Sequence, residues 1–573
     1  MIKTITIRNF MKEAGEVNIN PLDIEVKVKS LNYMGLIAGT IQDIGLIEKI
    51  DKLLPLDSGK GVITTNGQRV SAMIMNGLGF MNDRLYMVQE FYNDLPMEKL
   101  FSGDVKAENF NDDALGRALD AIYEYGTTKF FANISYAIGK EFNLIGNTAR
   151  HDTTSISVTG EYDNLNAEKK DDYNNEDFSL KHGHSKDHRP DLKQMILGLT
   201  TTGVSNFPLW FEVLSGNTSD KKSFHETKAK IEKFQEEINY PNKLIFILDS
   251  AFYNKEKLTS YTDSQWITRV PETVKEARKL LEKEDDISTW TKIDSNYKYR
   301  IEIQKYGDAT HKWKIIYSKD AHKKELVTLQ KRIEKLRAEA LKKVNQLMKE
   351  DFRCSKDALK AGKKLSKKLK YFNLECEDKK GMKKVKKEID DGKKYKNTEV
   401  FRLDIKLIDD VQAQKQAQNK VGKFIVATNI IDTNELADKD ILANYKSLSG
   451  TEKGFKFLKD DSFHTSSVFL KTPGRIQALM MVMALCLMIY NIAENRLRTN
   501  MMKVNETLPN QVKKEVKNPS FKWIAQMMRG IMVTYCYDKA GNFLKSNISN
   551  ISKIHKKVIN LFGGSAIKIY EIA

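Results

Sequence analysis

A run of apolar residues, Leu244 to Leu248, constrains the fold of this 573-residue chain more than any other segment. A strand that is apolar at every position is typically buried on both faces of a sheet. Further strand-like stretches lie at 151–158, 194–202, 208–216 and 265–271, and the charged stretch from 220 to 238 is helical in character. The pattern therefore predicts the order β-β-β-α-β-α-β, an α/β fold with a mixed sheet flanked by helices.

The residues before this region predict helices. In 109–126, Asn111 is a candidate N-cap, apolar residues recur at three- and four-residue spacing, and Gly126 can end the helix. After residue 271 the alternation of strands and helices is interrupted. The stretches 297–307 and 311–318 predict a two-stranded ribbon. The stretches 323–349 and 355–370 predict two lysine-rich helices that fold back on each other as a helical hairpin.

The sheet resumes at 424–430, and the apolar helix 474–498 follows. Within that helix, 478–490 is apolar throughout, which is shorter than the ~20 residues of a membrane span. We interpret it as a buried core helix and expect no membrane association. The pattern divides the chain into five segments. These are 1–147, mostly helical; 148–271, the first part of a core; 272–421, an insertion; 422–500, the second part of the core; and 501–573, a helical region.

The charge of the chain is concentrated in one window. The chain has 94 Lys and Arg against 76 Asp and Glu, a net charge of +18, and residues 321–400 alone hold 26 basic and 13 acidic residues. The first 150 residues are slightly acidic, with 16 basic and 19 acidic residues. Such a basic excess indicates either a polyanionic partner or a solvated lysine-rich helix, and composition alone leaves both open.

The cysteines and the first residues indicate the compartment. Four scattered cysteines, none in a CxxC pair, argue against a disulfide framework and against a thiolate zinc site, and are typical of a reducing compartment. The first 16 residues lack the apolar core of a signal peptide. These features predict a cytoplasmic protein.

Three carboxylates are candidate catalytic groups. Asp249 directly follows the run 244–248, at the strand end where ligands bind in open sheets, and Asp152 lies within the first predicted strand. Tyr445, Glu452 and Lys459 recur every seven residues and share one face if the stretch is helical. From the residues alone, a turn or cap aspartate and an exposed helix face explain the same pattern.

Several ordered blocks resemble bacterial insertion-sequence transposases of the DDE type, in particular the group with the signature YxxRxxxExxxxxxK. The resemblance covers about residues 25–500. The blocks are LNYMGLIAGTIQDIGLIEKID (31–51), NGLGF (76–80), NDDALGRALDAIYE (111–124), HDTTSISVTGEYD (151–163), GHSKDHRPDLKQ (183–194), LDSAFYN (248–254) and the spacing of Tyr445, Glu452 and Lys459.

The resemblance implies a ribonuclease H-like core with Asp152, Asp249 and Glu452 as the catalytic, metal-binding triad. It implies two Mg²⁺ ions, replaceable by Mn²⁺, and DNA phosphate contacts from Tyr445 and Lys459. Leu448 stands where the signature has arginine, so one contact is missing or comes from another residue. Independently of the family, two hard cations held by carboxylates can stabilise the attacking and leaving oxygens of a phosphodiester.

Other motifs admit ordinary interpretations. The histidine-rich stretch 181–191 contains Lys186 and Arg189, which are either near substrate DNA or part of a polar turn, and zinc binding there is disfavoured. Trp266, Trp290 and Trp313 are more typical of core packing than of stacking on an extruded base. No Walker A or Rossmann fingerprint is present, which argues against nucleotide hydrolysis.

The sequence therefore predicts a DNA transposase that cleaves transposon ends and joins them to target DNA, by a cut-and-paste route. The expected partners are double-stranded DNA and a second copy of the chain in a homodimer. The DNA comprises the terminal inverted repeats and the target. The segment 1–147 is expected to bind the DNA ends, and the segment 501–573 is expected to dimerise. The expected location is the bacterial cytoplasm, at the nucleoid when bound to DNA. The alternatives are a catalytically silent, domesticated DNA-binding protein derived from a transposase, and a structural nucleic-acid-binding protein.

Overall fold

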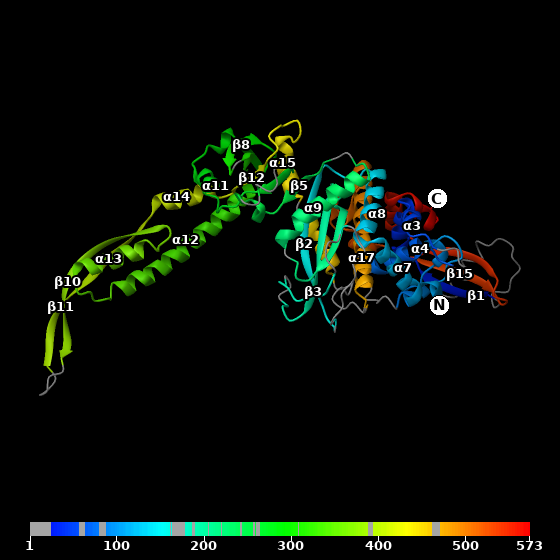
Figure 1. Ribbon diagram of the computed structural model, residues 1–573, viewed down its shortest axis with the longest axis horizontal. Helices are drawn as coiled ribbons and strands as arrows, with labels where there is room; N and C mark the ends of the chain where they lie inside the picture. Colours follow the sequence, from blue (N-terminus) through cyan, green and yellow to red (C-terminus); the bar gives the residue numbers. More distant parts are fainter. Residues whose placement is uncertain are drawn as a thin grey trace. The chain divides into compact units, whose positions relative to one another are not determined.

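The structure is a computed structural model, and it is mixed α/β (Figure 1). The described residues are 24–56, 63–79, 87–160, 162, 173, 178–185, 189–203, 205–218, 220–240, 243–255, 258, 264–307, 309–387, 394–447, 449–460, 470 and 472–572. The chain forms two compact units, one comprising 1–246 with 447–573 and the other comprising 247–446. The five segments predicted from sequence are thus grouped differently, because the helical leader, the first strands and the C-terminal region share one unit.

In the first unit, three antiparallel strands form the start of the sheet. They are β2 (Thr148–Val158), β3 (Lys193–Thr202) and β4 (Phe207–Ser215), in the hydrogen-bonded order β4-β3-β2. Helix α9 (Asp220–Glu237) follows, and β5 (Ile245–Leu248) starts beside β2, where the Ile245 N–H donates to the Asn147 carbonyl at 2.8 Å. The predicted order β-β-β-α-β is therefore confirmed for 148–248, and β5 is buried at all four positions as its apolar sequence predicts.

Helices surround these strands within the first unit. The leader contributes α2 (Met34–Asp43), α3 (Leu46–Leu53), α4 (Asn66–Gly77), α5 (Val88–Asn93), α6 (Met97–Leu100), α7 (Asp112–Tyr125) and α8 (Thr127–Glu141). As predicted, Asn111 caps α7, with its side chain accepting the Ala114 N–H at 3.0 Å, and Gly126 follows the helix at φ 98°. The capping residue and the apolar spacing together explain why α7 forms where it does.

Helix α17 (Pro473–Lys503) is the central element of the first unit's core. It packs against β4, α7, α4 and α8 (Figure 1). It is long and apolar enough to cross a membrane, but 83% of its most apolar window is buried inside the protein, which agrees with the predicted core helix. The part of this helix that is apolar on all sides, 478–490, requires such cover on every side.

The C-terminal region is not helical throughout, in contrast to the prediction. It contains α18 (Phe521–Met527), α19 (Lys553–Phe562) and α20 (Ser565–Ile569), but also β15 (Met532–Asp538) and β16 (Phe543–Ser549). Strand β15 pairs antiparallel with β16 and with β1 (Ile24–Ser30). Strands that pair across about 500 residues of sequence leave no local sign of their pairing. The alternation of apolar and polar residues in 532–549 is weak, and no strand was predicted there from the sequence.

The second unit contains the sheet β6-β12-β9-β8-β7, in which β7 is the two-residue edge strand Thr291–Lys292. Its main strands are β6 (Trp266–Arg269), β8 (Tyr297–Tyr306), β9 (Ala309–Ser318) and β12 (Lys423–Thr428). The ribbon predicted at 297–318 is the antiparallel pair β8–β9. Because β12 lies between β6 and β9, the strand predicted to resume the core belongs to the same sheet as the insertion's ribbon.

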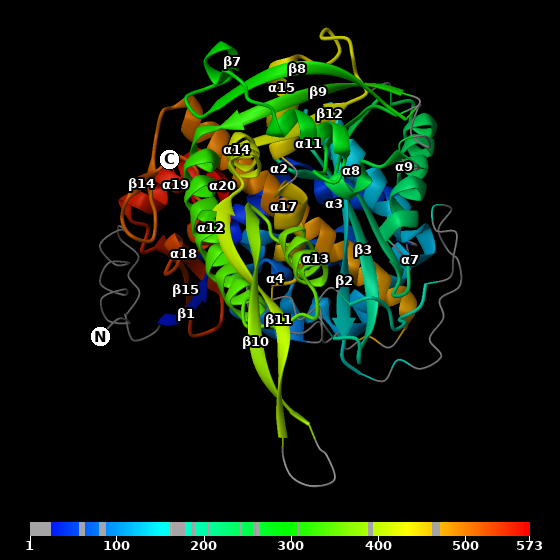
Figure 2. The same cartoon turned by 90° about the vertical axis from the view of Figure 1, so that its left-hand side faces the viewer.

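The predicted helical hairpin is wrong. Helices α12 (Lys319–Leu347) and α13 (Ser355–Ser366) form as expected, but α13 packs on a long ribbon of β10 (Phe372–Lys387) and β11 (Lys394–Asp409) (Figure 2). Val344 and Leu347 of α12, Ala358 of α13, and Leu403 and Ile405 of β11 share one small core. The lysines of 379–387 hide the strand pattern, because they occur in consecutive pairs and so interrupt any alternation of apolar and polar residues.

Candidate functional site

Asp152 is an exposed carboxylate in an otherwise buried strand. Its neighbours from Thr153 to Val158 in β2 are all buried, and its Oδ1 accepts the Thr153 N–H at 2.8 Å. Side chains alternate between the two faces of a strand, so Arg150 and Asp152 lie on the same face. The contacts of Arg150 show which element packs on that face.

Arg150 connects this face of β2 to the start of helix α16 (Ser449–Leu458). Its guanidinium is 3% exposed and donates to the Gly203 carbonyl at 3.0 Å and to the Ser447 hydroxyl, two residues before the helix. Burial lowers the pKa of Arg150 to about 10, so the side chain remains cationic at neutral pH. A buried cation with oxygen acceptors is a rigid attachment for the chain entering α16.

Thr451 forms the second attachment of α16. Its hydroxyl is hydrogen-bonded to the Thr201 hydroxyl at 2.9 Å and donates to the Arg150 carbonyl at 3.3 Å. Glu452, the next residue, is exposed on the same first turn. Asp152 and Glu452 are therefore presented by two elements that pack directly on each other within the first unit.

Asp249 belongs to the second unit and follows β5, as predicted. It is exposed, and its Oδ1 accepts the backbone N–H and, at 3.1 Å, the hydroxyl of Ser250. Its backbone carbonyl accepts the Thr268 hydroxyl of β6 at 2.9 Å. The carboxylate thus begins a short turn that is attached to the neighbouring strand.

A buried network supports the residues after Asp249. The Tyr253 hydroxyl accepts from Trp313 Nε1 at 2.8 Å and lies 2.9 Å from His311 Nδ1. Because this hydroxyl already accepts from tryptophan, its own proton is available to His311 Nδ1, which must then be unprotonated. Burial lowers the pKa of His311 to about 4, in agreement with a neutral ring.

The three carboxylates are suitable donors for Mg²⁺, since each is exposed and supplies hard oxygen atoms. They are nevertheless distributed between the two units, with Asp152 and Glu452 in one and Asp249 in the other. In the part of the chain that the structure describes, no three His, Cys, Asp or Glu side chains form a group that could hold a metal ion. The predicted triad therefore stays a prediction.

The predicted DNA contacts on one helical face are not on one helix. Tyr445 lies on α15 (Asp438–Lys446), Glu452 lies on α16, and Lys459 directly follows α16. The seven-residue spacing assumed an unbroken helix, whereas the chain turns at Ser447. Gly450 packs closely on Asn206: an added Cβ would lie 1.9 Å from Asn206 Oδ1, so a larger residue would require that side chain to move.

The remaining predicted residues have simpler roles or lie outside the described residues. Lys186 and Leu448 are outside them. Arg189 is exposed and forms a two-point ion pair with Asp191, at 2.9 Å from Nε and 2.7 Å from Nη2, which lowers the pKa of Asp191. The three tryptophans are buried, as predicted: Trp266, Trp290 and Trp313 are 2%, 6% and 0% exposed.

Sequence reasoning missed Arg150 and Thr451. The available signal was the alternation of Arg150 and Asp152 in a strand whose other members are uncharged. Two charged residues at i and i+2 in a buried strand indicate a face that is covered by another polar element. The threonine carries no such signal, because its role depends on the packing of α16.

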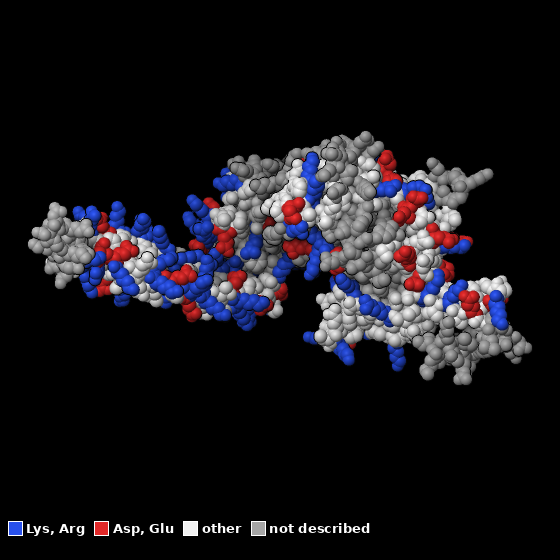
Figure 3. Space-filling model, turned by 90° about the horizontal axis from the view of Figure 1, so that it is seen from below, with Lys and Arg blue, Asp and Glu red and all other residues white. Residues whose placement is uncertain are grey.

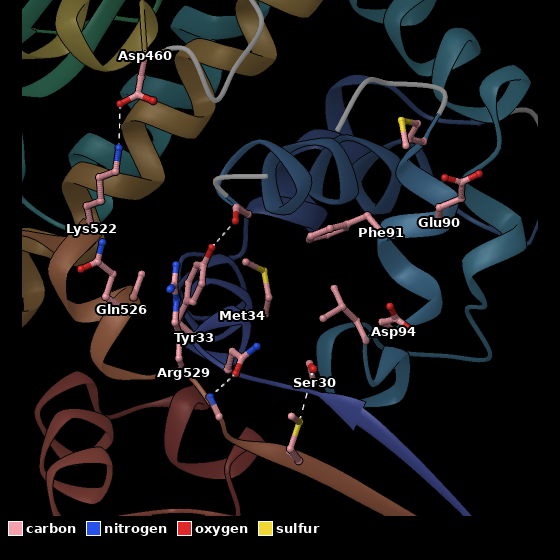
Figure 4. A pocket seen from close by; sticks show the side chains of 17 residues that line it. Ser30, Tyr33, Met34, Glu90, Phe91, Asp94, Asp460, Lys522, Gln526 and Arg529 are labelled. Atoms are coloured by element: carbon pink, nitrogen blue, oxygen red, sulfur yellow. Dashed lines mark hydrogen bonds and ion pairs between the residues drawn. The ribbon is translucent and has the colours of Figure 1, made fainter. Parts of the chain in front are cut away.

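A cavity of about 740 Å³ lies in the first unit near the end of α16 (Figure 4). Tyr33, Met34 and Phe91 line it, with Glu90 and Asp94 on one side and Arg529 beside Tyr33. Asp460, one residue after Lys459, reaches its rim and pairs with Lys522 at 2.9 Å. Its walls carry both signs of charge, so electrostatics select no class of ligand.

Helix α13 and the residues just after it carry a group of exposed lysines. Exposed lysines on and just after it are Lys356, Lys360, Lys363, Lys364, Lys367, Lys368 and Lys370. Among the described residues none of these forms an ion pair, whereas Lys379, Lys380 and Lys383 of β10 pair with Asp404, Glu399 and Asp351. Figure 3 shows Lys and Arg gathered on this part of the unit.

Comparison with known proteins finds one family model that is similar to part of the leader. Residues 26–136 match a family described as a domain of unknown function, DUF4277. The match covers fewer than half of the residues, and its description carries no activity. No curated protein matches the chain.

Among solved structures, the chain is similar to one described as the cryo-EM structure of a piggyBac transposase synaptic complex with hairpin DNA. The two share 7% sequence identity, the alignment covers 87% of this chain and 78% of the other, and the TM-score is 0.33. A score of that size does not establish a common fold.

Proposed function

We propose that this chain is a DNA transposase of the DDE type that cleaves the ends of a mobile element and joins them to target DNA. The observation that carries the proposal is the placement of Asp152 and Glu452 on two elements that pack on each other. Two exposed carboxylates are presented by β2 and α16, which buried Arg150 and Thr451 attach to each other. The order of strands in 148–248 agrees with the ribonuclease H-like core implied by the sequence resemblance.

The proposal assigns Asp152, Asp249 and Glu452 one task, the binding of Mg²⁺ or Mn²⁺. When bound, two such ions stabilise charge on the phosphate oxygens and lower the pKa of an attacking water. The chain's own contribution is to hold the carboxylates rigidly. Arg150 and Thr451 fix the start of α16, and the Ser250 and Thr268 hydrogen bonds fix the backbone at Asp249.

DNA binding is assigned first to α13 and the residues just after it. Seven exposed lysines without ion pairs among the described residues, and one acidic residue, Asp357, in the same stretch, suit sequence-independent contact with phosphate. Tyr445 and Lys459 remain proposed phosphate contacts from the signature spacing. Cut-and-paste movement through hairpin ends and action as a homodimer are proposed on the family resemblance alone.

The test is strand cleavage by the full chain on duplexes carrying the DNA that flanks its gene, with and without Mg²⁺. We expect Mg²⁺-dependent cleavage, and we expect Asp249→Asn to abolish it while DNA affinity stays within about twofold of wild type. Cleavage by Asp249→Asn at the wild-type rate would show that the assignment is wrong. Hairpinned ends among the products would support the cut-and-paste route, and blunt or nicked ends alone would contradict it.

A second function, a DNA-binding protein without nuclease activity, is favoured by one observation. No metal-binding group of three is assembled among the described residues. This alternative predicts tight DNA binding without any Mg²⁺-dependent cleavage by wild type. The two functions are therefore separated by the same assay.

A further inference from the structure

A second cavity in the first unit contains a buried arginine that has no anionic partner among the described residues. The cavity has a volume of about 480 Å³ and lies where the N-terminal ends of α4 and α7 meet. Arg69 of α4 lines it and is 4% exposed. Its Nε donates to the Thr64 hydroxyl at 3.1 Å, and among the described residues its two terminal nitrogens have no hydrogen-bond or ion-pair partner.

A second guanidinium faces the same space. Arg117 of α7 lines the cavity, is exposed, and forms no ion pair among the described residues. Burial, and next the nearby charge of Arg117, lowers the pKa of Arg69. Two arginines therefore repel each other across a partly enclosed space. Placing a buried guanidinium there without a counter-charge is costly, unless an anion occupies the space.

The other walls are partly apolar, with Pro55, Leu56, Ile63, Ala114 and Ala121, and they carry little opposing charge. Asn66, Asn109 and Asn111 line the cavity, and Glu108 is its one acidic residue among those described. Helix N-termini carry partial positive charge, and guanidinium groups donate two parallel hydrogen bonds to phosphate oxygens. The cavity is also larger than a single phosphate group requires, so an attached sugar can be accommodated.

We propose that the Arg69–Arg117 cavity binds a phosphate group, and that the group belongs to the backbone of DNA. The phosphate site stands on the cavity alone, whereas its assignment to DNA rests on the proposed function. Both arginines lie within 26–136, so the proposal gives this domain of unknown function a binding role. It also provides a local positive site in a leader segment whose overall charge is slightly negative.

The test uses the full chain, with Arg117→Gln as the main variant because Arg117 is exposed. In the first arm, thermal unfolding is measured with inorganic phosphate against chloride at equal ionic strength. Phosphate should raise the Tm of wild type and not that of Arg117→Gln. In the second arm, binding of a labelled duplex is measured by fluorescence anisotropy over a range of salt concentrations.

In the DNA arm, Arg117→Gln should weaken binding roughly tenfold and reduce the slope of log K against log salt by about 0.9. The matched control is Arg529→Gln, which removes the same charge at an exposed position of the same unit. It should change the DNA affinity and the salt slope less than Arg117→Gln does. Arg69→Lys should show the same losses as Arg117→Gln if it folds, because lysine cannot make the two-point contact.

Equal effects of the Arg117 and Arg529 variants on DNA binding would overturn the DNA assignment, because general electrostatics would then explain both. A phosphate-dependent rise in Tm that is lost in Arg117→Gln, with unchanged DNA binding, would keep the phosphate site and overturn the DNA backbone as its source. No phosphate effect on wild type would overturn the site itself. None of these outcomes depends on strand cleavage, so failure here is distinguishable from failure of the transposase proposal.

Discussion

At the scale of single residues, His311 links stability to pH. Its ring is 1% exposed and accepts from Tyr253, and its pKa is lowered from 6.5 to about 4 by burial. The unfolded chain binds a proton at this site near pH 6.5, and the folded chain does so near pH 4. The contribution of His311 to stability is therefore fully present above pH 6.5 and is lost as the pH falls towards 4.

We expect the Tm of wild type to fall more steeply between pH 6.5 and 4 than that of His311→Gln, which cannot be protonated. The difference corresponds to about 3 kcal/mol across that interval if the shift is fully expressed. The measurement is thermal unfolding of both proteins at several pH values in one buffer series. Parallel pH profiles of the two proteins would contradict the assignment, and His322→Gln serves as the control for a partly exposed histidine.

At the scale of elements, the attachment of α16 to the sheet determines where Glu452 lies. Thr451→Val keeps the shape of the side chain and removes the hydroxyl that bonds to Thr201 and to the Arg150 carbonyl. We expect this change to cost about 1 kcal/mol of stability and to lower the rate of Mg²⁺-dependent cleavage roughly tenfold, with DNA affinity unchanged. The measurements are thermal unfolding, single-turnover cleavage and duplex binding.

The matched control is Thr328→Val on α12, whose hydroxyl bonds only to the Lys324 carbonyl of its own helix at 3.0 Å. It should leave cleavage unchanged. If Thr451→Val lost stability but cleaved DNA at the wild-type rate, the hydrogen bonds of Thr451 would have a structural role only. Loss of DNA affinity in the Thr451 variant would likewise count against a positioning role.

The elements also show how far the sequence predicts this fold. Strands β2 to β5 and helix α7 carry strong local signals, namely an apolar run, β-branched stretches and an Asn cap, and all were predicted. Pairing between β1 and β15 depends on residues about 500 positions apart, and β10 is masked by its lysines. The seven-residue spacing from Tyr445 to Lys459 predicted one helix, but the chain turns at Ser447, whose hydroxyl accepts a hydrogen bond from Arg150.

The candidate site was likewise predicted only in part. The placement of Asp152 in a strand, Asp249 after a strand and Glu452 in a helix follows from short-range pattern and was predicted. The contacts that position Asp152 and Glu452 were not predicted, because Arg150 and Thr451 lie about 300 residues apart in sequence and meet only in the folded chain. Arg69 was missed for a related reason, since nothing in the sequence distinguishes a buried arginine from a solvated one on a helix.

At the scale of the whole molecule, the net charge of +18 does not act uniformly. Among the described residues, Lys379, Lys380 and Lys383 of β10 pair with acidic side chains, whereas the lysines of α13 form no ion pair. Counterions condensed on DNA are released only by charges that reach phosphate, and each such contact changes the salt slope of binding by about 0.9. The location of a lysine should therefore matter more than the number of lysines.

Replacing Lys363, Lys364, Lys367 and Lys368 with Gln removes four charges from α13 and the residues after it. We expect the salt slope of duplex binding to fall by about 2 to 4 and the affinity to fall at least tenfold at moderate salt. The matched control replaces Lys323, Lys324, Lys331 and Lys335 of α12, which are also exposed but interspersed with Glu325 and Glu334. The two variants have the same net charge, so total charge alone predicts identical salt slopes for them. A phosphate-binding surface on α13 instead predicts a large change of slope in the α13 variant and a small change in the α12 variant.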